Sequence, residues 1–449
     1  MEQDIAMTNT INFHELAKLN PAQRESLQRR TETDLSIFEA KAKPIIEAVR
    51  VEGDEALARF AREFDKSPVD ADQLAATEAD FAAAEKTINP AVREALEFAA
   101  GSIRKFHHDQ MPEQMWLHEI RPGAFGGDRS TPIPSVACYV PRGKGAFPSA
   151  ALMLSIPAQV AGVKDVCIIT PPGPNGQIDD ATLVAAHMAG VSKVYKAGGA
   201  QGIAAVAFGT QTISKASKVV GPGSPWVGAA KRLLSHLIDT GTPAGPSEVI
   251  ILADDSVSGK LAGLDLLVEA EHGPDSSAYL VTWSKRVAEE AMAAIPEYWK
   301  QMGALRVGYS STVLSGPMGG IVLARDEADA LAFCNEYAAE HLEVLSKEPF
   351  QYLGRLEHAG EILLGEHTPT TLGNYVIGPN HCLPTSGWAK TSSAVSVFDF
   401  LKRTSIAYVT SKGYPELAKH AHVLASYEGF DGHANAVSKL RDAMLKDQS

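Results

Sequence analysis

The sequence predicts an α/β protein with two Rossmann-like lobes, each a doubly wound parallel sheet, between a helical N-terminal region and a small helical C-terminal tail. Its 449 residues exceed what one compact core usually holds. Short β-branched runs alternate with helical runs from about residue 131, and the same rhythm recurs from about residue 248. We therefore expect four regions: an N-terminal region, part of which joins the second lobe (1–130), a first lobe (131–247), a second lobe (248–392) and a helical C-terminal tail (393–449).

The composition excludes several classes of protein. Hydrophobic residues make up 45% of the chain and charged residues 21%, as in ordinary globular domains. The formal net charge is -13 and no basic run occurs, so we expect no nucleic-acid partner. No apolar stretch reaches the roughly 18 residues of a transmembrane helix, and the N-terminus lacks a signal-peptide pattern. We therefore expect no membrane partner either.

The cysteines stand far apart along the chain, at Cys138, Cys167, Cys334 and Cys382. This spacing argues against a disulfide framework and against a cysteine-rich metal site. It indicates a reducing, cytoplasmic environment.

The N-terminal region has apolar residues at helical spacing over 31–65 and again over about 77–110. We expect this helical character to continue to about residue 130.

The first lobe carries glycine-rich turns after three of its expected strands. The strands are expected at 136–140, 165–170, 193–197 and 218–221. The turns are Tyr139-Val-Pro-Arg-Gly-Lys-Gly, Gly198-Gly-Ala-Gln201-Gly and Gly221-Pro-Gly223-Ser224, and each opens a helix. Glycine there lets backbone N–H groups approach a phosphate at a helix N-terminus. Three such turns along one sheet favour a nucleotide site, although any one of them is also compatible with a simple tight turn, and no G-x-G-x-x-G is present.

The second lobe has expected strands at 248–254, 278–282, 319–325 and 341–346. Before the second of these, Glu269 and His272 are three residues apart at the end of a helical run, so they share one helix face. A carboxylate and an imidazole in that arrangement can bind zinc. The alternative is a solvated helix end with a capping histidine.

Glu340 and His341 stand where a helical run passes into a strand. We expect such a junction at the carboxyl edge of the sheet, where an adjacent glutamate and histidine can share acid/base work. The alternative is a pair of surface polar residues in a turn.

Two later segments also combine histidines with turn residues. Residues 373–385 contain too many Gly, Pro and Asn for a regular element, and such a loop either holds site residues or connects the lobes. Residues 428–436 place His433 in the helical tail, where it is either a ligand or a surface histidine.

A series of motifs between about 136 and 440 resembles the histidinol dehydrogenase family in wording and order. They are Y-V-P-x-G, P-S-x-x-L-M, G-G-A-Q-x-I-A-A, K-x-V-G-P-G, A-G-P-S-E-V, A-E-H, E-H-L-E, G-P-N-H-x-L-P-T, S-V-x-D-F-L-K-R-T-S and G-x-x-x-H-x-N-A-V. The first 130 residues are similar to the family only loosely.

The resemblance implies a zinc site formed by Glu269, His272, Asn374 and His433. Two of these depart from the family pattern, because Glu269 replaces a glutamine and Asn374 an aspartate. The two changes are opposite in charge, so the formal charge of the ligand set is kept. Because zinc accepts carboxylate oxygen readily, we expect the metal to be retained.

The resemblance also implies roles for eight further residues. Glu340 and His341 correspond to the family's acid/base pair. The substrate contacts are expected at Ser247, His381 and Glu428, and the NAD contacts at Tyr139, Gln201 and Ser224. Ser224 replaces the usual asparagine, and Arg142 the usual glycine.

The implied activity is the oxidation of an amino alcohol, through the aldehyde, to a carboxylic acid with two NAD; for the family this is L-histidinol to L-histidine. His341 is expected as the base and Glu340 as the group that helps water add to the aldehyde. The resemblance further implies a homodimer in which the tail residues Glu428 and His433 complete the partner's site. The alternatives are a paralogue acting on another small alcohol such as dihydroxypropanesulfonate, with Arg142 pairing with its anionic group, and a metal- or nucleotide-binding protein without turnover.

Overall fold

The computed structural model describes residues 10–30, 35–142 and 145–446, and it divides into two units. The first unit comprises Met1–Gln110 and Ile133–Phe400, and the second comprises Met111–Pro132 and Leu401–Ser449. The expected helical run therefore includes four residues, 31–34, that lie outside the described part, as do 143–144 of the first glycine-rich turn. No helix in the described ranges has both the length and the apolar character needed to cross a bilayer.

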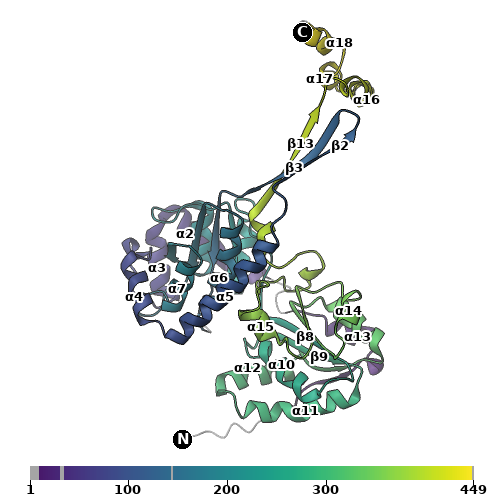
Figure 1. The fold of residues 1–449 in the computed structure, drawn as a ribbon. Coiled ribbons are helices and arrows are strands. Elements are labelled where there is room, and N and C mark those ends of the chain that lie inside the picture. The colour runs from purple at the N-terminus through teal and green to yellow at the C-terminus, as the bar shows by residue number, and fades with distance from the viewer. Residues whose placement is uncertain (1–9, 31–34, 143–144, 447–449) are drawn as a thin grey trace. The chain divides into compact units, whose positions relative to one another are not determined.

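The first sheet is a four-stranded parallel sheet in the order β6-β5-β4-β7 (Figure 1). Its strands are β4 (Ser135–Tyr139), β5 (Asp165–Thr170), β6 (Lys193–Lys196) and β7 (Lys218–Val220). In chain order this is 3-2-1-4, which is the order of a Rossmann half. The strand order reverses between β4 and β7, where ligands of open α/β sheets bind at the carboxyl ends.

Helices cover both faces of the first sheet. Packed on one face are α2 (Ser36–Glu52), α3 (Asp54–Phe64), α8 (Gly199–Phe208) and α9 (Pro225–Leu234). A second group comprises α4 (Glu78–Thr87), α5 (Pro90–Asp109), α6 (Pro148–Val160) and α7 (Asp180–Met188), which pack against one another. The N-terminal helices α2 and α3 thus form part of the first lobe's core, since Ala42, Val49 and Leu57 are buried there.

The second sheet is a six-stranded parallel sheet in the order β1-β10-β9-β8-β11-β12. Its strands are β1 (Phe13–Glu15), β8 (Glu248–Ala253), β9 (Ser277–Thr282), β10 (Gly319–Leu323), β11 (His341–Leu345) and β12 (Glu361–Leu364). The four central strands again run 3-2-1-4. The N-terminal region supplies the edge strand β1, which pairs with β10.

The two faces of the second sheet have separate apolar cores. One core contains α10 (Gly259–Ala270), α11 (Lys285–Trp299) and α12 (Ala304–Ser315). The other contains α13 (Glu327–Tyr337) and α14 (Phe350–Leu353). Neighbouring residues of β8 alternate between them, because Val249 and Ile251 enter the first core and Ile250 and Leu252 the second. The predicted α/β class with two parallel sheets is confirmed.

The second unit is an antiparallel three-stranded ribbon followed by helices. The ribbon has the order β13-β3-β2 and contains β2 (Met115–Arg121), β3 (Ala124–Pro132) and β13 (Leu401–Val409). The helices are α16 (Tyr414–Tyr427), α17 (Asp431–Ala436) and α18 (Lys439–Lys446). The expectation of helix up to about residue 130 is wrong for 115–130, and the expected helical tail over 393–449 is wrong for 401–409, where β13 lies. All seven residues of β2 are exposed, so the segment has no buried face to give the sequence a strand periodicity.

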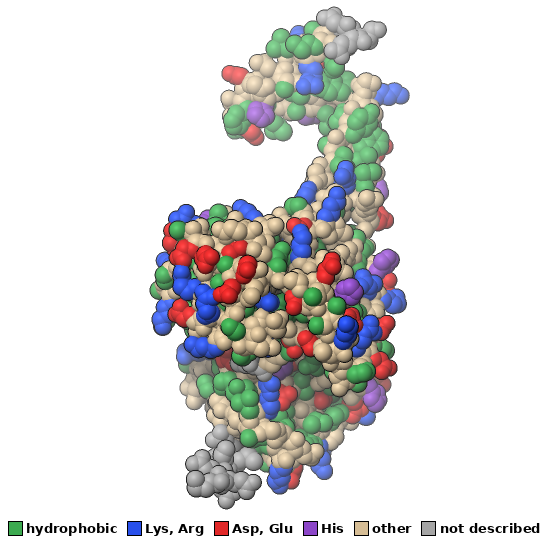
Figure 2. Space-filling model, turned by 90° about the vertical axis from the view of Figure 1, so that its left-hand side faces the viewer, with side chains coloured by type: hydrophobic (Ala, Val, Ile, Leu, Met, Phe, Trp, Pro, Cys, Tyr) green, Lys and Arg blue, Asp and Glu red, His purple; other side chains and the backbone are tan. Residues whose placement is uncertain are grey.

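The surface of the second unit carries many large hydrophobic side chains. Exposed on the strands and helices are Met115, Trp116, Leu117, Ile120, Tyr408, Val409, Val423, Leu424, Tyr427, Phe430, Leu440, Met444 and Leu445. Figure 2 shows such side chains gathered along this unit. A groove of about 850 Å³ runs between α16 and the segment 437–445, with Val423, Leu440 and Leu445 among its lining residues.

Candidate active site

The Glu340–His341 pair lies at the amino edge of the second sheet. Ala338 ends α13 in the left-handed region, with φ 55°, and this turn leads into β11, of which His341 is the first residue. A left-handed conformation costs a non-glycine residue about 1–2 kcal/mol, and such strain concentrates at functional sites. The expectation that the pair lies at the carboxyl edge is wrong, because a chain that leaves a helix in a parallel sheet re-enters at the amino end of the next strand.

The Glu340 carboxylate is fixed by backbone. Its Oε2 accepts a hydrogen bond of 2.9 Å from the backbone N–H of Glu248, at the start of the neighbouring strand β8. Burial raises the pKa of Glu340 to about 8. Glu340 is therefore suited to exchange a proton near neutral pH.

The His341 imidazole is oriented by a residue that the sequence did not single out. Its Nδ1 lies 3.0 Å from Oε2 of Glu361, which begins β12 directly opposite His341 in register. Burial alone would lower the pKa of His341. The hydrogen bond with Glu361 and the charges of Glu269 and Glu340 outweigh burial and raise this pKa to about 9. A carboxylate on Nδ1 selects the tautomer that leaves Nε2 as the basic nitrogen.

Three of the predicted zinc ligands meet in one cluster. Asn374, on the short helix α15 (Thr370–Tyr375), donates from Nδ2 to Oε1 of Glu269 at 2.7 Å. The His272 Nδ1 lies 2.9 Å from Oε2 of Glu269, and Glu269 is fully buried. Burial favours the protonated form of Glu269, but the charge of His272 outweighs it and holds the pKa of Glu269 well below its usual range.

The predicted substrate residues Ser247 and His381 lie beside this cluster. Ser247 Oγ is 2.9 Å from Nδ1 of His272. Burial, together with the charges of His341 and His272, lowers the pKa of His381 to about 4. Its Nε2 is buried without a hydrogen-bond partner. His381 is thus a neutral imidazole with a free nitrogen next to the acid/base pair.

Glu269, His272 and Asn374 could supply three of the four ligands that zinc usually takes. The Oε2 atom of Glu269 is buried and faces the His272 imidazole at 2.9 Å, and zinc takes carboxylate oxygen and imidazole nitrogen. Over the described ranges no group of three His, Cys, Asp or Glu side chains is arranged to hold a metal. Two predicted ligands account for this result, because Asn374 supplies an amide and His433 belongs to the second unit.

The predicted nucleotide residues lie at the carboxyl edge of the first sheet. Tyr139 ends β4, and its hydroxyl accepts a hydrogen bond of 3.1 Å from the backbone N–H of Gly199, at the start of α8. Gln201 is buried in the first turn of the same helix. Burial raises the pKa of Tyr139 to about 12, so its phenol stays protonated.

Ser224 is the N-cap residue of α9, and its side chain makes no capping hydrogen bond. The turn before it is held by Lys231, a buried residue that sequence reasoning missed. Its Nζ donates to the Gly221 carbonyl at 2.7 Å, and burial lowers the pKa of this amine to about 8. Gly221 has φ 120°, and a Cβ there would lie 2.3 Å from the Tyr139 carbonyl oxygen. The ends of β4 and β7 can therefore lie this close together only because residue 221 is a glycine, without a Cβ.

The loop after α15 connects the two edges. Asn380 donates from Nδ2 to the carbonyl of Met153 on α6 of the first lobe. The next residues are His381, beside the acid/base pair, and Cys382, whose thiol feels the charges of both Glu340 and Lys231. The edge of the first lobe that carries the predicted nucleotide residues and the edge of the second lobe that carries Glu340 and His341 thus share one loop.

Three residues named from the sequence have other surroundings. Arg142 Nη1 donates to the Gln177 carbonyl at 3.4 Å. Glu428 is exposed at the C-cap of α16, and His433 is exposed in α17, where its ring lies 5.3 Å from that of Phe430. Both tail residues belong to the second unit.

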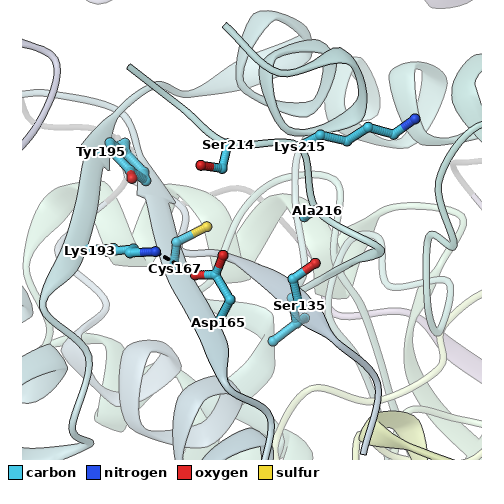
Figure 3. Close-up of a pocket in the computed structure, with 9 residues that line it drawn as sticks. Ser135, Asp165, Cys167, Lys193, Tyr195, Ser214, Lys215 and Ala216 are labelled. Carbon is cyan, nitrogen blue, oxygen red and sulfur yellow. Dashed lines mark hydrogen bonds and ion pairs between the residues drawn. The ribbon is translucent and has the colours of Figure 1, made fainter. Parts of the chain in front are cut away.

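A cavity of about 10 Å³ lies at the opposite, amino edge of the first sheet (Figure 3). Ser135, Asp165 and Lys193 line it, each at the start of a strand, and Lys193 pairs with Asp165 at 2.8 Å. This volume holds about one water molecule, so it is no substrate site.

The comparisons with known proteins decide the family. The histidinol dehydrogenase family profile matches residues 28–441. The chain belongs to the histidinol dehydrogenase family. It is 60% identical to a histidinol dehydrogenase homolog of Rhizobium meliloti (99% of this chain, 97% of that relative) and 48% identical to a histidinol dehydrogenase of Synechocystis (96% and 99%). The crystal structure of a histidinol dehydrogenase from Elizabethkingia anophelis superposes with a TM-score of 0.91 at 30% identity, covering 98% of this chain and 99% of that one.

This chain is therefore an NAD-dependent oxidoreductase. The histidinol dehydrogenase family is known to use NAD and zinc. The deviations of this chain from the family motif at Glu269 and Asn374 meet in one hydrogen bond. Here the amide of Asn374 faces the carboxylate of Glu269. The family's usual glutamine at position 269 and aspartate at position 374 would provide the same two groups with their positions exchanged. The double deviation therefore keeps both the hydrogen bond and the charge.

Gly221→Ala is expected to weaken NAD binding at least about tenfold, or roughly 1.4 kcal/mol. The added methyl group would lie 2.3 Å from the Tyr139 carbonyl oxygen and must force β4 and β7 apart. Titration of NAD by calorimetry measures the effect. Gly228→Ala on α9 is the matched control, because its Cβ meets only a Leu35 side chain at 3.5 Å. Equal NAD affinity in a folded Gly221→Ala variant would contradict the assignment of this edge.

Proposed function

We propose that this enzyme oxidises L-histidinol, or a small amino alcohol of closely similar shape, through the aldehyde to the carboxylic acid. The observation that carries the proposal is the buried pair of Glu340 and His341, oriented by Glu248 and Glu361 in a member of the histidinol dehydrogenase family. Glu269, His272 and Asn374, with His433 of the tail, are the residues that would hold zinc. Ser247, His381 and Glu428 would bind the substrate, and Tyr139, Gln201 and Ser224 the NAD.

In the first oxidation, His341 takes the proton of the alcohol hydroxyl at Nε2, while Glu361 holds Nδ1. The hydride of the same carbon leaves for NAD, which supplies the hydride acceptor when bound. Zinc, when bound, supplies a Lewis acid that polarises the substrate. The neutral His381 contributes a hydrogen-bonding nitrogen without adding a positive charge beside a cationic amine.

The second oxidation requires a water molecule. Glu340 accepts a proton as water adds to the aldehyde, and His341 takes the hydroxyl proton of the resulting hydrate while a second hydride leaves for a second NAD. Each base must first lose its proton. The pKa of Glu340, about 8, and that of His341, about 9, place the rise of activity with pH on the alkaline side of neutrality in the absence of metal. A cation held by Glu269 would lower both values.

The direct experiment follows NADH absorbance with zinc-loaded protein and a panel of alcohols that contains L-histidinol and dihydroxypropanesulfonate. We expect turnover of L-histidinol with two NADH formed per alcohol. Turnover of dihydroxypropanesulfonate alone would replace the proposed substrate, and no turnover of any alcohol would contradict the proposal.

Glu361→Gln is expected to reduce kcat by roughly 10²–10⁴-fold, the usual contribution of a positioned acid/base group. The carboxylate stabilises the imidazolium, so its removal lowers the pKa of His341 below about 9, and the amide can also donate to Nδ1 and select the wrong tautomer. NMR titration of the metal-free protein measures the pKa, and steady-state kinetics measures kcat. Glu357→Gln, an exposed glutamate of the same segment, is the control. An unchanged pKa in Glu361→Gln would remove Glu361 from the site.

The double variant Glu269→Gln with Asn374→Asp tests the exchanged ligands. The exchange moves one negative charge across the site, and charges about 4 Å apart interact by several kcal/mol at intermediate dielectric. We expect kcat/KM for L-histidinol to rise at least severalfold in the double variant, with zinc content unchanged by elemental analysis. The single variants, which alter the net charge, are the controls. No gain in the double variant would mean that the compensating hydrogen bond also preserves substrate preference.

We further propose that the chain acts as a homodimer whose tail completes the partner's site. The exposed apolar residues of the second unit and the groove beside α16 support this proposal, since monomers rarely expose so much apolar surface. Mixing refolded His341→Asn and His433→Ala chains, each inactive alone, should restore up to about a quarter of the activity, because half of the dimers then contain one intact site. Complete absence of complementation in a mixed dimer would contradict sharing between chains.

A further inference from the structure

Two carboxyl groups outside the catalytic set face each other in the core of the second lobe. Asp265 of α10 and Glu343 of β11 are both buried, each with a carboxyl oxygen that no donor of the described residues reaches, and the two carboxyl groups lie within interaction distance of one another. Thr370, the first residue of α15, donates from its backbone N–H and its hydroxyl to Oε2 of Glu343, each at 3.0 Å.

The contact between the two groups requires a proton. Oδ2 of Asp265 and Oε1 of Glu343 are buried and receive no hydrogen bond from any other donor of the described residues. An ionised carboxylate only accepts hydrogen bonds, so two of them bond only if one carries a proton. Two buried negative charges in contact would also be strongly unfavourable.

The pair joins the three elements that carry the candidate site. On α10, Asp265 lies four residues before Glu269, and on α15, Thr370 lies four residues before Asn374, so each is one helical turn from its site residue. On β11, Glu343 lies two residues after His341 and points to the same side of the sheet. The spacing of Glu269, Asn374 and His341 therefore depends on how closely α10, α15 and β11 are held together.

We propose that Asp265 and Glu343 share one proton and act as a positioning pair that fixes the distance between the zinc-binding residues and the catalytic base. The positioning role rests on the proposed function, whereas the shared proton does not. Neither residue touches the substrate.

Burial favours retention of this proton at neutral pH. Burial raises the pKa of both groups, and Asp265 raises that of Glu343 further. Four titratable groups on or beside the packed elements are engaged elsewhere: Glu269 with His272 and Asn374, His341 with Glu361, Glu290 of α11 with Gly259, and Arg306 of α12 with the Glu271 carbonyl.

The shared proton predicts a particular pH dependence of stability. The unfolded chain loses the corresponding proton near the ordinary carboxyl pKa of 4.5, while the folded chain keeps it. The pair's contribution to stability is therefore greatest in acid, and the unfolding equilibrium constant rises with pH by up to about tenfold per unit until the folded pair ionises. Glu343→Gln supplies a permanent N–H donor to Asp265 and should remove this slope.

The test combines infrared spectroscopy, denaturant unfolding and kinetics on the full-length enzyme. The wild-type minus Glu343→Gln difference spectrum should show the C=O stretching band of a buried protonated carboxyl at neutral pH, because the Glu340 carboxyl, with a pKa of about 8, contributes equally to both proteins and cancels. Unfolding at about pH 6 and about pH 8 should show Glu343→Gln gaining stability relative to wild type as the pH rises. Glu348→Gln, an exposed glutamate just after β11, is the control and should change neither reading.

The positioning role is tested by comparing Glu343→Gln with Glu343→Ala. The alanine variant leaves Asp265 without its partner and should lower zinc affinity and kcat at least about tenfold with an unchanged KM for NAD, whereas the glutamine variant should restore both. Equal loss in the two variants, or absence of the protonated band from the wild-type minus Glu343→Gln difference spectrum, would overturn the proposal. If Glu343→Ala does not fold, Asp265→Asn, which also supplies a donor, must keep near wild-type zinc affinity. A protonated band in a protein that oxidises no alcohol would retain the shared proton and reject the proposed function.

Discussion

The structure of the second lobe depends on the pairing of buried carboxylates. Glu248, Glu269, Glu340 and Glu343 are all buried around the amino half of one sheet. An isolated buried carboxylate is too costly to persist, so each must be paired, hydrogen-bonded or protonated. Glu248 pairs with Arg30 at 2.8 Å, and Glu269 is bonded to Asn374 and adjacent to His272. These pairings hold segments that are far apart in the chain, from Arg30 to Asn374, around the candidate base His341.

The candidate nucleotide residues and the candidate acid/base residues lie on two sheets of similar strand order, at the carboxyl edge of the first and the amino edge of the second. In the first sheet, the residues proposed to bind NAD lie at the carboxyl ends of β4 and β7, where the strand order places ligand sites of open α/β sheets. In the second sheet, the acid/base pair lies at the amino edge, where Glu340 and His341 enter β11. The loop through Asn380 and Cys382 joins the two edges. A dehydrogenase needs its hydride acceptor next to its base, and this loop provides the connection.

Sequence reasoning predicted the parallel strands well, because buried strands such as β5 and β8 are continuous apolar runs between glycine-rich turns. It missed the β2–β3 hairpin, whose first strand is exposed throughout. It also missed Glu361, since β12 has only four residues and an acid at its start resembles a surface residue. The residues of the candidate cluster came from the family motifs. Their spacing alone did not distinguish them from solvated helix ends, because contacts such as that of Glu269 with Asn374, 105 residues apart, depend on the tertiary fold.

The measurement that tests the central claim most directly is zinc-edge anomalous diffraction from crystals of the zinc-loaded enzyme with NAD and L-histidinol. The account predicts one anomalous peak per chain bonded to Glu269 and His272, with the alcohol oxygen within hydrogen-bond reach of Nε2 of His341 and the nicotinamide reached from the Tyr139 edge. A zinc peak or an alcohol bound at the carboxyl edge of the second sheet, away from His341, would contradict it.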